Sequence, residues 1–160
     1  MIQTEIRSRT AIKGHPLHPA LIHFPVATLL LVVATDITFI ITGRDFWAEA
    51  SFWLIVVGLG FGILSSIPGA IDVFSVHKIR HIVAAWAHAL VAVMTLSLSA
   101  FNLMLRVGTE PGAMIVPWGI YVSGLAGVFI YITGSLGAQL VFEYGVGIDV
   151  PVEDDRQVDP

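Results

Sequence analysis

The stretch ALIHFPVATLLLVVATDITFIIT, residues 20–42, decides the fold. It runs for more than 20 residues and carries a single formally charged side chain, that of Asp36. A bilayer core about 30 Å thick needs about 20 apolar residues per helix, so this stretch is long enough to cross it. It also lacks the short apolar core and small-residue cleavage pattern of a signal peptide. We therefore predict a retained transmembrane helix.

Three more stretches have the same length and character, at residues 50–73, 82–105 and 115–142. Across the 160 residues, 56% are hydrophobic and 12% are charged, and the mean hydropathy is +0.83. A chain of this composition needs lipid around it. We predict an all-α, integral membrane four-helix bundle at residues 19–145. Residues 1–18 form an N-terminal segment, and residues 146–160 form an acidic tail that we expect to be disordered.

The basic residues indicate how the bundle sits in the membrane. Six of the eight lie before the first span, between the second and third, or after the last, and two lie in the opposite loops. The six are Arg7, Arg9, Lys13, Lys78, Arg80 and Arg156, and the two are Arg44 and Arg106. Because cationic loops stay in the cytoplasm, we predict a multi-pass protein of the bacterial cytoplasmic membrane with both termini inside. The net charge of −4 argues against a nucleic-acid partner.

Small residues and prolines interrupt the apolar spans. Gly58 and Gly62 lie one helical turn apart, which favours close helix packing. Alternatively, such glycines clear a slot for a flat cofactor. Pro25 and Pro68 each remove a backbone hydrogen bond in the cytoplasmic half of a span. The freed carbonyls need partners inside the bundle, so we expect a site in that half.

All six histidines lie at the cytoplasmic ends of the first and third spans. They are His15, His18 and His23 on the first, and His77, His81 and His88 on the third. The spacings of four and seven residues in the second group predict one stripe on a helix that begins just before His77. A polar stripe in a membrane must face protein or a cavity, and each buried imidazole needs a partner. Convergence from two helices indicates a ligand site.

Haem b fits this set of donors best. The chain has no cysteine, which excludes thiolate ligands, and the histidine cluster has few carboxylates near it. Paired histidines on facing helices of a bundle are a common way to hold haem iron. We predict His23 and His88 as the deepest axial pair, and His18 with His81 or His77 as a second. The haem count is therefore one or two.

Other residues at this face are expected to support the cofactor. Asp72 and Glu143 end the second and fourth spans, and we predict that they accept hydrogen bonds from the far nitrogens of ligating histidines. Lys78 and Arg80 supply a cationic rim for haem propionates, and His15 completes the group of cofactor-binding candidates.

The predicted function is electron transfer within the membrane, to or from a quinone or a redox protein. An alternative is a non-haem metal-binding or proton-coupled transport protein that uses the histidines with Asp72 and Asp36. Asp36 itself is expected to reach the outer interface or to pair with Thr35 or Thr38. A homodimer is a candidate assembly, because four helices are few for alternating access. The chain has no phosphate-binding glycine loop and no HExxH motif, so hydrolytic and phosphoryl-transfer chemistry is not expected. An electron-transfer protein is favoured over an enzyme with its own substrate.

Two motifs carry a resemblance to a known family. The string GHPLHPALIHFPVA, residues 14–27, and the sequence PGAID, residues 68–72, resemble bacterial membrane proteins catalogued as domain of unknown function 2231. The resemblance covers residues 12–149 and implies the same four-helix layout. Similar proteins are joined to Rieske-type or cytochrome c-type domains, which implies a redox setting and haem b. Many members carry a histidine near the position of Glu143 or Tyr144, whereas this chain has FEYG, so the resemblance implies ligands on the first and third spans here.

Overall fold

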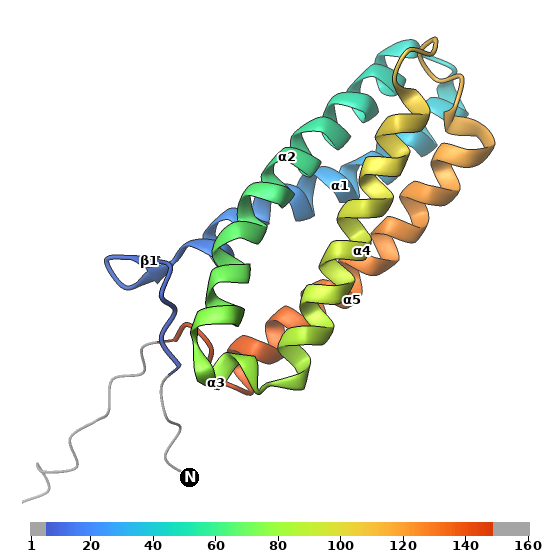
Figure 1. The fold of residues 1–160 in the computed structure, drawn as a ribbon. Coiled ribbons are helices and arrows are strands. Elements are labelled where there is room, and N and C mark those ends of the chain that lie inside the picture. Colours follow the sequence, from blue (N-terminus) through green and yellow to red (C-terminus); the bar gives the residue numbers. More distant parts are fainter. Residues whose placement is uncertain (1–5, 149–160) are drawn as a thin grey trace, which may run out of the picture.

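The computed structural model describes residues 6–148 (Figure 1). The predicted acidic tail lies largely outside these residues. The elements in chain order are β1 Ala11–Ile12, β2 His15–Pro16, α1 Leu17–Thr42, α2 Asp45–Ser75, α3 His77–Arg80, α4 Val83–Arg106, the short π-helix η1 Ile115–Gly119, and α5 Ile120–Phe142. β1 and β2 form a small antiparallel hairpin just before α1.

Four helical segments are long and apolar enough to cross a membrane: α1, α2, α4, and η1 joined to α5. The prediction of an all-α, four-helix membrane bundle is thereby confirmed. The first two helices are longer than predicted, because α1 begins at Leu17 and α2 runs from Asp45 to Ser75. Their additional turns contain polar residues, which a pattern of uninterrupted apolar residues does not include.

The helices lie in the circular order α1, α2, α4, α5, each packed against its two neighbours. α1 and α4 are therefore diagonally opposite across the bundle (Figure 1). Large apolar side chains point outward along the helices, among them Leu30, Leu90 and Val128. An outer surface of this kind is suited to lipid rather than water.

Gly58 and Gly62 serve helix packing. A Cβ atom at Gly58 would lie 2.7 Å from the side chain of Leu29 on α1, and one at Gly62 would overlap Leu96 on α4. Both contacts are with neighbouring helices, so these glycines let α2 approach α1 and α4 closely.

The helix predicted to run from just before His77 into the third span is broken where that span begins. The helix α3 ends at Arg80, and α4 begins at Val83 after an extended residue, Ile82. The predicted continuous stripe of His77, His81 and His88 is therefore wrong. The break follows from packing, since α3 buries Ile79 and the Trp86 indole N–H donates to the Arg80 carbonyl, 2.9 Å away.

The two ends of the described chain meet at the α3 end of the bundle. Ile6 is buried with Ile79 and Ile82, and it forms a parallel β-bridge with Val146. The Gly147 N–H donates to the Ile6 carbonyl, 2.9 Å away. The N-terminal and C-terminal segments thus cover the same end of the bundle (Figure 1).

Candidate functional site

His18 and His88 bring two imidazole rings together inside the bundle. His18 lies in the first turn of α1 and His88 in the second turn of α4, on diagonally opposite helices. Their ring centroids are 5.9 Å apart, and the ring planes are perpendicular. Both side chains are partly buried. Two imidazole rings from separate helices thus lie next to each other inside the bundle.

Each of these rings is held by a backbone carbonyl of a third or fourth helix. The His18 Nδ1 lies 2.8 Å from the Ser65 carbonyl oxygen on α2, and the His88 Nδ1 lies 2.9 Å from that of Thr133 on α5. A carbonyl oxygen can only accept, so each Nδ1 carries the proton and donates. A neutral imidazole then has its lone pair on Nε2, which is the atom free to bind a metal.

A glycine makes room for each ring. Gly69 follows Ser65 by four residues, and Gly137 follows Thr133 by four. A Cβ at Gly69 would lie 3.0 Å from His18 Nδ1, and one at Gly137 would lie 3.3 Å from His88 Cε1. In both cases the ring therefore rests against a helix backbone at a position without a side chain. The same arrangement, a carbonyl followed four residues later by a glycine, occurs on both α2 and α5.

The structure does not bring the predicted pair His23 and His88 together. His23 is exposed, and its Nδ1 lies 3.4 Å from the Ala20 carbonyl of its own helix. His18 and His23 are five residues apart, which places them about 140° apart around a helix of 3.6 residues per turn. The two side chains cannot face the same point, and His18 is the one beside His88.

The other predicted pairings with His18 are not formed either. His77 and His81 contact each other, with Nε2 atoms 3.2 Å apart and ring centroids at 4.4 Å. Both are exposed, on or just after α3. His15 is exposed as well, with its Nδ1 3.0 Å from the Lys13 carbonyl.

Asp72 binds the N-terminal segment rather than a histidine. Its carboxylate accepts from the Ser8 hydroxyl, from the backbone N–H of Arg9 at 2.8 Å, and from the Thr10 hydroxyl at 3.1 Å. The predicted hydrogen bond to a ligating histidine is therefore wrong, because residues 8–10 already occupy this carboxylate. Asp72 is nonetheless close to the site along α2, three residues beyond Gly69.

The remaining predicted supporting residues lie at the same end of the bundle. Glu143 is exposed and accepts from the Gln139 side-chain amide at 2.9 Å, so it too is not placed as a histidine partner. Lys78 and Arg80 are exposed on α3. These two cations lie at the end of the bundle that contains the imidazole pair, and their predicted contact with propionates stays a prediction.

A buried polar network at the opposite end was missed by the sequence reasoning. Asp36 is fully buried on α1, and its two oxygens accept from the Arg106 guanidinium on α4 at 2.9 and 2.7 Å. Ser51 on α2 and Ser123 on α5 also donate to this carboxylate. All four long helices are thus joined at one ion pair. The expectation that Asp36 reaches the interface or pairs with Thr35 or Thr38 is wrong.

A signal for this network is present in the sequence. Asp36 and Arg106 lie at the same end of their spans, and each is an isolated charge within or at the edge of an apolar run. Charges at such positions are expected to pair.

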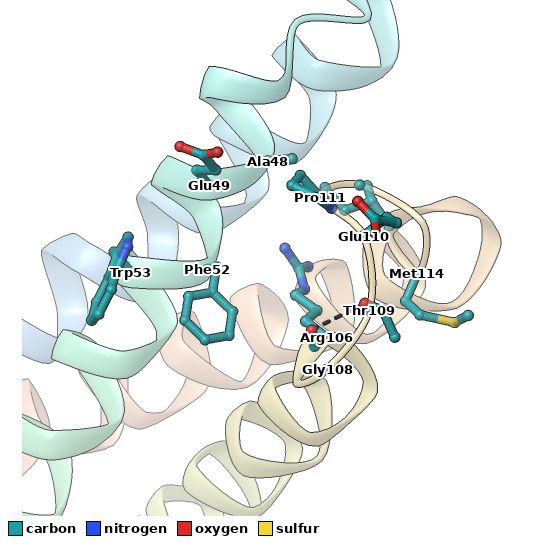
Figure 2. A pocket seen from close by; sticks show the side chains of 12 residues that line it. Ala48, Glu49, Phe52, Trp53, Arg106, Gly108, Thr109, Glu110, Pro111 and Met114 are labelled. Carbon is teal, nitrogen blue, oxygen red and sulfur yellow. Dashed lines mark hydrogen bonds between the residues drawn. The ribbon is translucent and has the colours of Figure 1, made fainter.

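A cavity of about 230 Å³ borders the network at the end of the bundle opposite the histidines (Figure 2). Arg106 lies on one side of it and Phe52 and Trp53 of α2 on the other, with the loop after α4 closing it. Glu49 and Glu110 also line it. None of the residues lining it is a histidine, so it is separate from the imidazole pair.

The donor sets available for metals are small. Within residues 6–148, no group of three or more His, Cys, Asp and Glu side chains is placed to hold a metal ion. The histidine ring contacts described there are two pairs, His18 with His88 and His77 with His81.

Comparison with known proteins identifies the family. The family described as "Predicted membrane protein (DUF2231)" matches residues 14–150, which include all four spans and all six histidines. No curated protein and no solved structure matches the chain significantly. The chain belongs to the DUF2231 family of predicted membrane proteins.

Proposed function

We propose that this protein is a membrane-bound b-type cytochrome that holds one haem between His18 and His88 and carries electrons. The observation that carries the proposal is the meeting of two imidazoles from diagonal helices, each with Nδ1 bound to a backbone carbonyl. This arrangement fixes the tautomer and the ring orientation, as partners of metal-ligating histidines usually do.

The donor set fits haem better than a free metal ion. Porphyrin supplies four nitrogen ligands, so haem iron needs only two from the protein. Structural zinc needs about four protein ligands. Bonds of about 2.0–2.1 Å between a metal and each imidazole nitrogen would place the centroids of two opposed rings about 6.4 Å apart. The centroids of His18 and His88 are 5.9 Å apart, a little closer than that spacing.

The ligand pair also favours electron transfer over oxygen binding. When bound, the haem would supply one-electron redox chemistry. His18 and His88 would hold the group, and the carbonyls of Ser65 and Thr133 would orient the two imidazoles through their Nδ1 atoms. A second haem has no comparable pair, because His77 and His81 lie on one side of one short helix.

Orientation follows from the basic residues. We place the haem in the cytoplasmic half of a bacterial inner membrane, with both termini in the cytoplasm. Arg106 is neutralised by Asp36, so Arg44 is the remaining cation among the described residues of the outer loops. Lys78 and Arg80 lie at the haem end and suit propionates. The electron partner would be a quinone or a redox protein at that face.

The alternative function, metal or proton handling by histidines with carboxylates, has less support. It needs Asp36 or Asp72 to be available beside an imidazole. Asp36 is held by Arg106, Ser51 and Ser123, and Asp72 is held by residues 8–10. Neither carboxylate has a hydrogen bond to a histidine.

A spectroscopic experiment tests the proposal. Wild-type protein from haem-replete cells, purified in mild detergent, should show a sharp α-band on reduction and one haem per chain by the pyridine haemochrome assay. His18→Ala and His88→Ala should each lose at least nine-tenths of the haem, while the exposed-histidine controls His15→Ala and His23→Ala should retain it. A colourless wild type, or haem retained in both His18→Ala and His88→Ala, would overturn the proposal.

A further inference from the structure

His77 and His81 form a second imidazole pair with a different geometry. They lie four residues apart, and their Nε2 atoms are 3.2 Å apart. The ring centroids are 4.4 Å apart and the planes are tilted by 55°. In a metal-free pair, one Nε2–H donates to the other. The two nitrogens therefore lie side by side on the surface.

The separation of the two nitrogens matches one kind of metal ion. Bonds of 2.0–2.1 Å to a tetrahedral ion place two ligand atoms about 3.3 Å apart, whereas adjacent ligands of a square-planar ion lie about 2.9 Å apart. The observed 3.2 Å is close to the tetrahedral value. Neutral imidazole and tetrahedral geometry together suit Zn²⁺.

The backbone that carries the pair is fixed before any ion binds. Ile79, between the two histidines, is 2% exposed and belongs to the core at this end of the bundle. The Trp86 indole N–H donates to the Arg80 carbonyl at 2.9 Å, which ties the end of α3 to α4. A pair held in this way has less conformational entropy to lose when it chelates an ion.

We infer that His77 and His81 form a surface site for Zn²⁺, with water completing the coordination. Both rings are exposed, so an ion can reach them from the aqueous face. Lys78 and Arg80 adjoin the pair in sequence and weaken the attraction for a cation, which makes the site an exchangeable one. The site is separate from His18 and His88, and it does not depend on the proposed haem.

Calorimetric titration of the haem-replete protein with Zn²⁺, in detergent and without a polyhistidine tag, tests this site. We expect one exchangeable ion per chain. His77→Ala and His81→Ala should each weaken binding at least tenfold, because each removes one of two protein ligands. His15→Ala removes an exposed histidine outside the pair and should leave the affinity within threefold of wild type.

The thermal unfolding midpoint of each variant shows whether it is folded, and His77→Gln is a second substitution that keeps a polar side chain. Absence of Zn²⁺ binding to wild type would overturn the inference. So would unchanged binding in both His77→Ala and His81→Ala, or an equal loss in His15→Ala. Because haem binding depends on other histidines, a failed zinc site and a failed haem site give different results.

Discussion

At the scale of single residues, Asp36 is a carboxylate that is fully buried among the helices. It is 0% exposed in the half of the bundle opposite the histidines, and its carboxylate is bound by Arg106, Ser51 and Ser123. The Asn102 side-chain oxygen accepts a further hydrogen bond from Arg106 Nε, 3.0 Å away. Charges in such a place are tolerable only when they are paired and hydrogen-bonded.

Removing one partner of this ion pair should destabilise the protein strongly. Asp36→Ala leaves the Arg106 guanidinium buried without its counter-charge, which costs about 3–5 kcal/mol in comparable buried pairs. The double variant Asp36→Ala with Arg106→Ala should recover part of that loss, because it leaves no unpaired charge. Equilibrium unfolding in mixed detergent micelles measures both, with the exposed Arg44→Ala as a control. A loss below 1 kcal/mol for Asp36→Ala would contradict the network's stabilising role.

The histidines show which part of the candidate site could be predicted from the sequence and which part could not. All six histidines were predicted to lie at one end of the bundle, since hydropathy alone locates the span ends. Choosing His18 over His23 needed the rotation of α1 relative to its neighbours. Both histidines lie near the start of α1, so depth in the membrane could not separate them. Only the direction of each side chain does so.

At the scale of helices, the site depends on two helix surfaces that contribute no ligand. Ser65 with Gly69 on α2, and Thr133 with Gly137 on α5, each offer a carbonyl and a cleared space for an imidazole. The sequence showed these glycines but not their role, because a ring packed on a helix and a helix packed on a helix need the same small residue.

Filling either cleared space should displace an imidazole. Gly69→Val and Gly137→Val place side-chain atoms where the His18 and His88 rings lie. Even a Cβ atom alone would lie 3.0 Å from the His18 ring in the first variant and 3.3 Å from the His88 ring in the second. We expect each variant to lose at least half of its haem or to shift its reduced α-band. Gly134→Val, one turn earlier on α5, is the matched control because nothing lies within 4 Å of that position. Equal haem content in all four proteins, including wild type, would argue against this role.

The break between helices α3 and α4 could not be predicted from the sequence. The run from His77 to Arg106 has no proline or glycine, so periodicity predicted one continuous helix. The structure interrupts it at Ile82 because Ile79 and Ile82 both turn into the core beneath the bundle. Tertiary burial of apolar side chains thus overrides local helix preference.

At the scale of the whole molecule, the four-helix membrane architecture was predictable because lipid imposes strict limits on span length and polarity. The chain contains no cysteine, so its orientation can be mapped with single introduced thiols. Lys13→Cys should resist a membrane-impermeant maleimide in intact spheroplasts and react after lysis, because the positive-inside rule places it in the cytoplasm. Arg44→Cys, at the opposite end of the bundle, should react without lysis. The reverse pattern would contradict the orientation.

We propose above that one haem is held between His18 and His88. Low-temperature electron paramagnetic resonance of the oxidised protein tests it most directly, because the spectrum reports both axial ligands. Perpendicular imidazole planes, as these two rings have, predict a low-spin ferric signal with a large principal g value. His18→Ala and His88→Ala should abolish that signal. A high-spin ferric spectrum in the wild type, or no haem iron at all, would contradict the account.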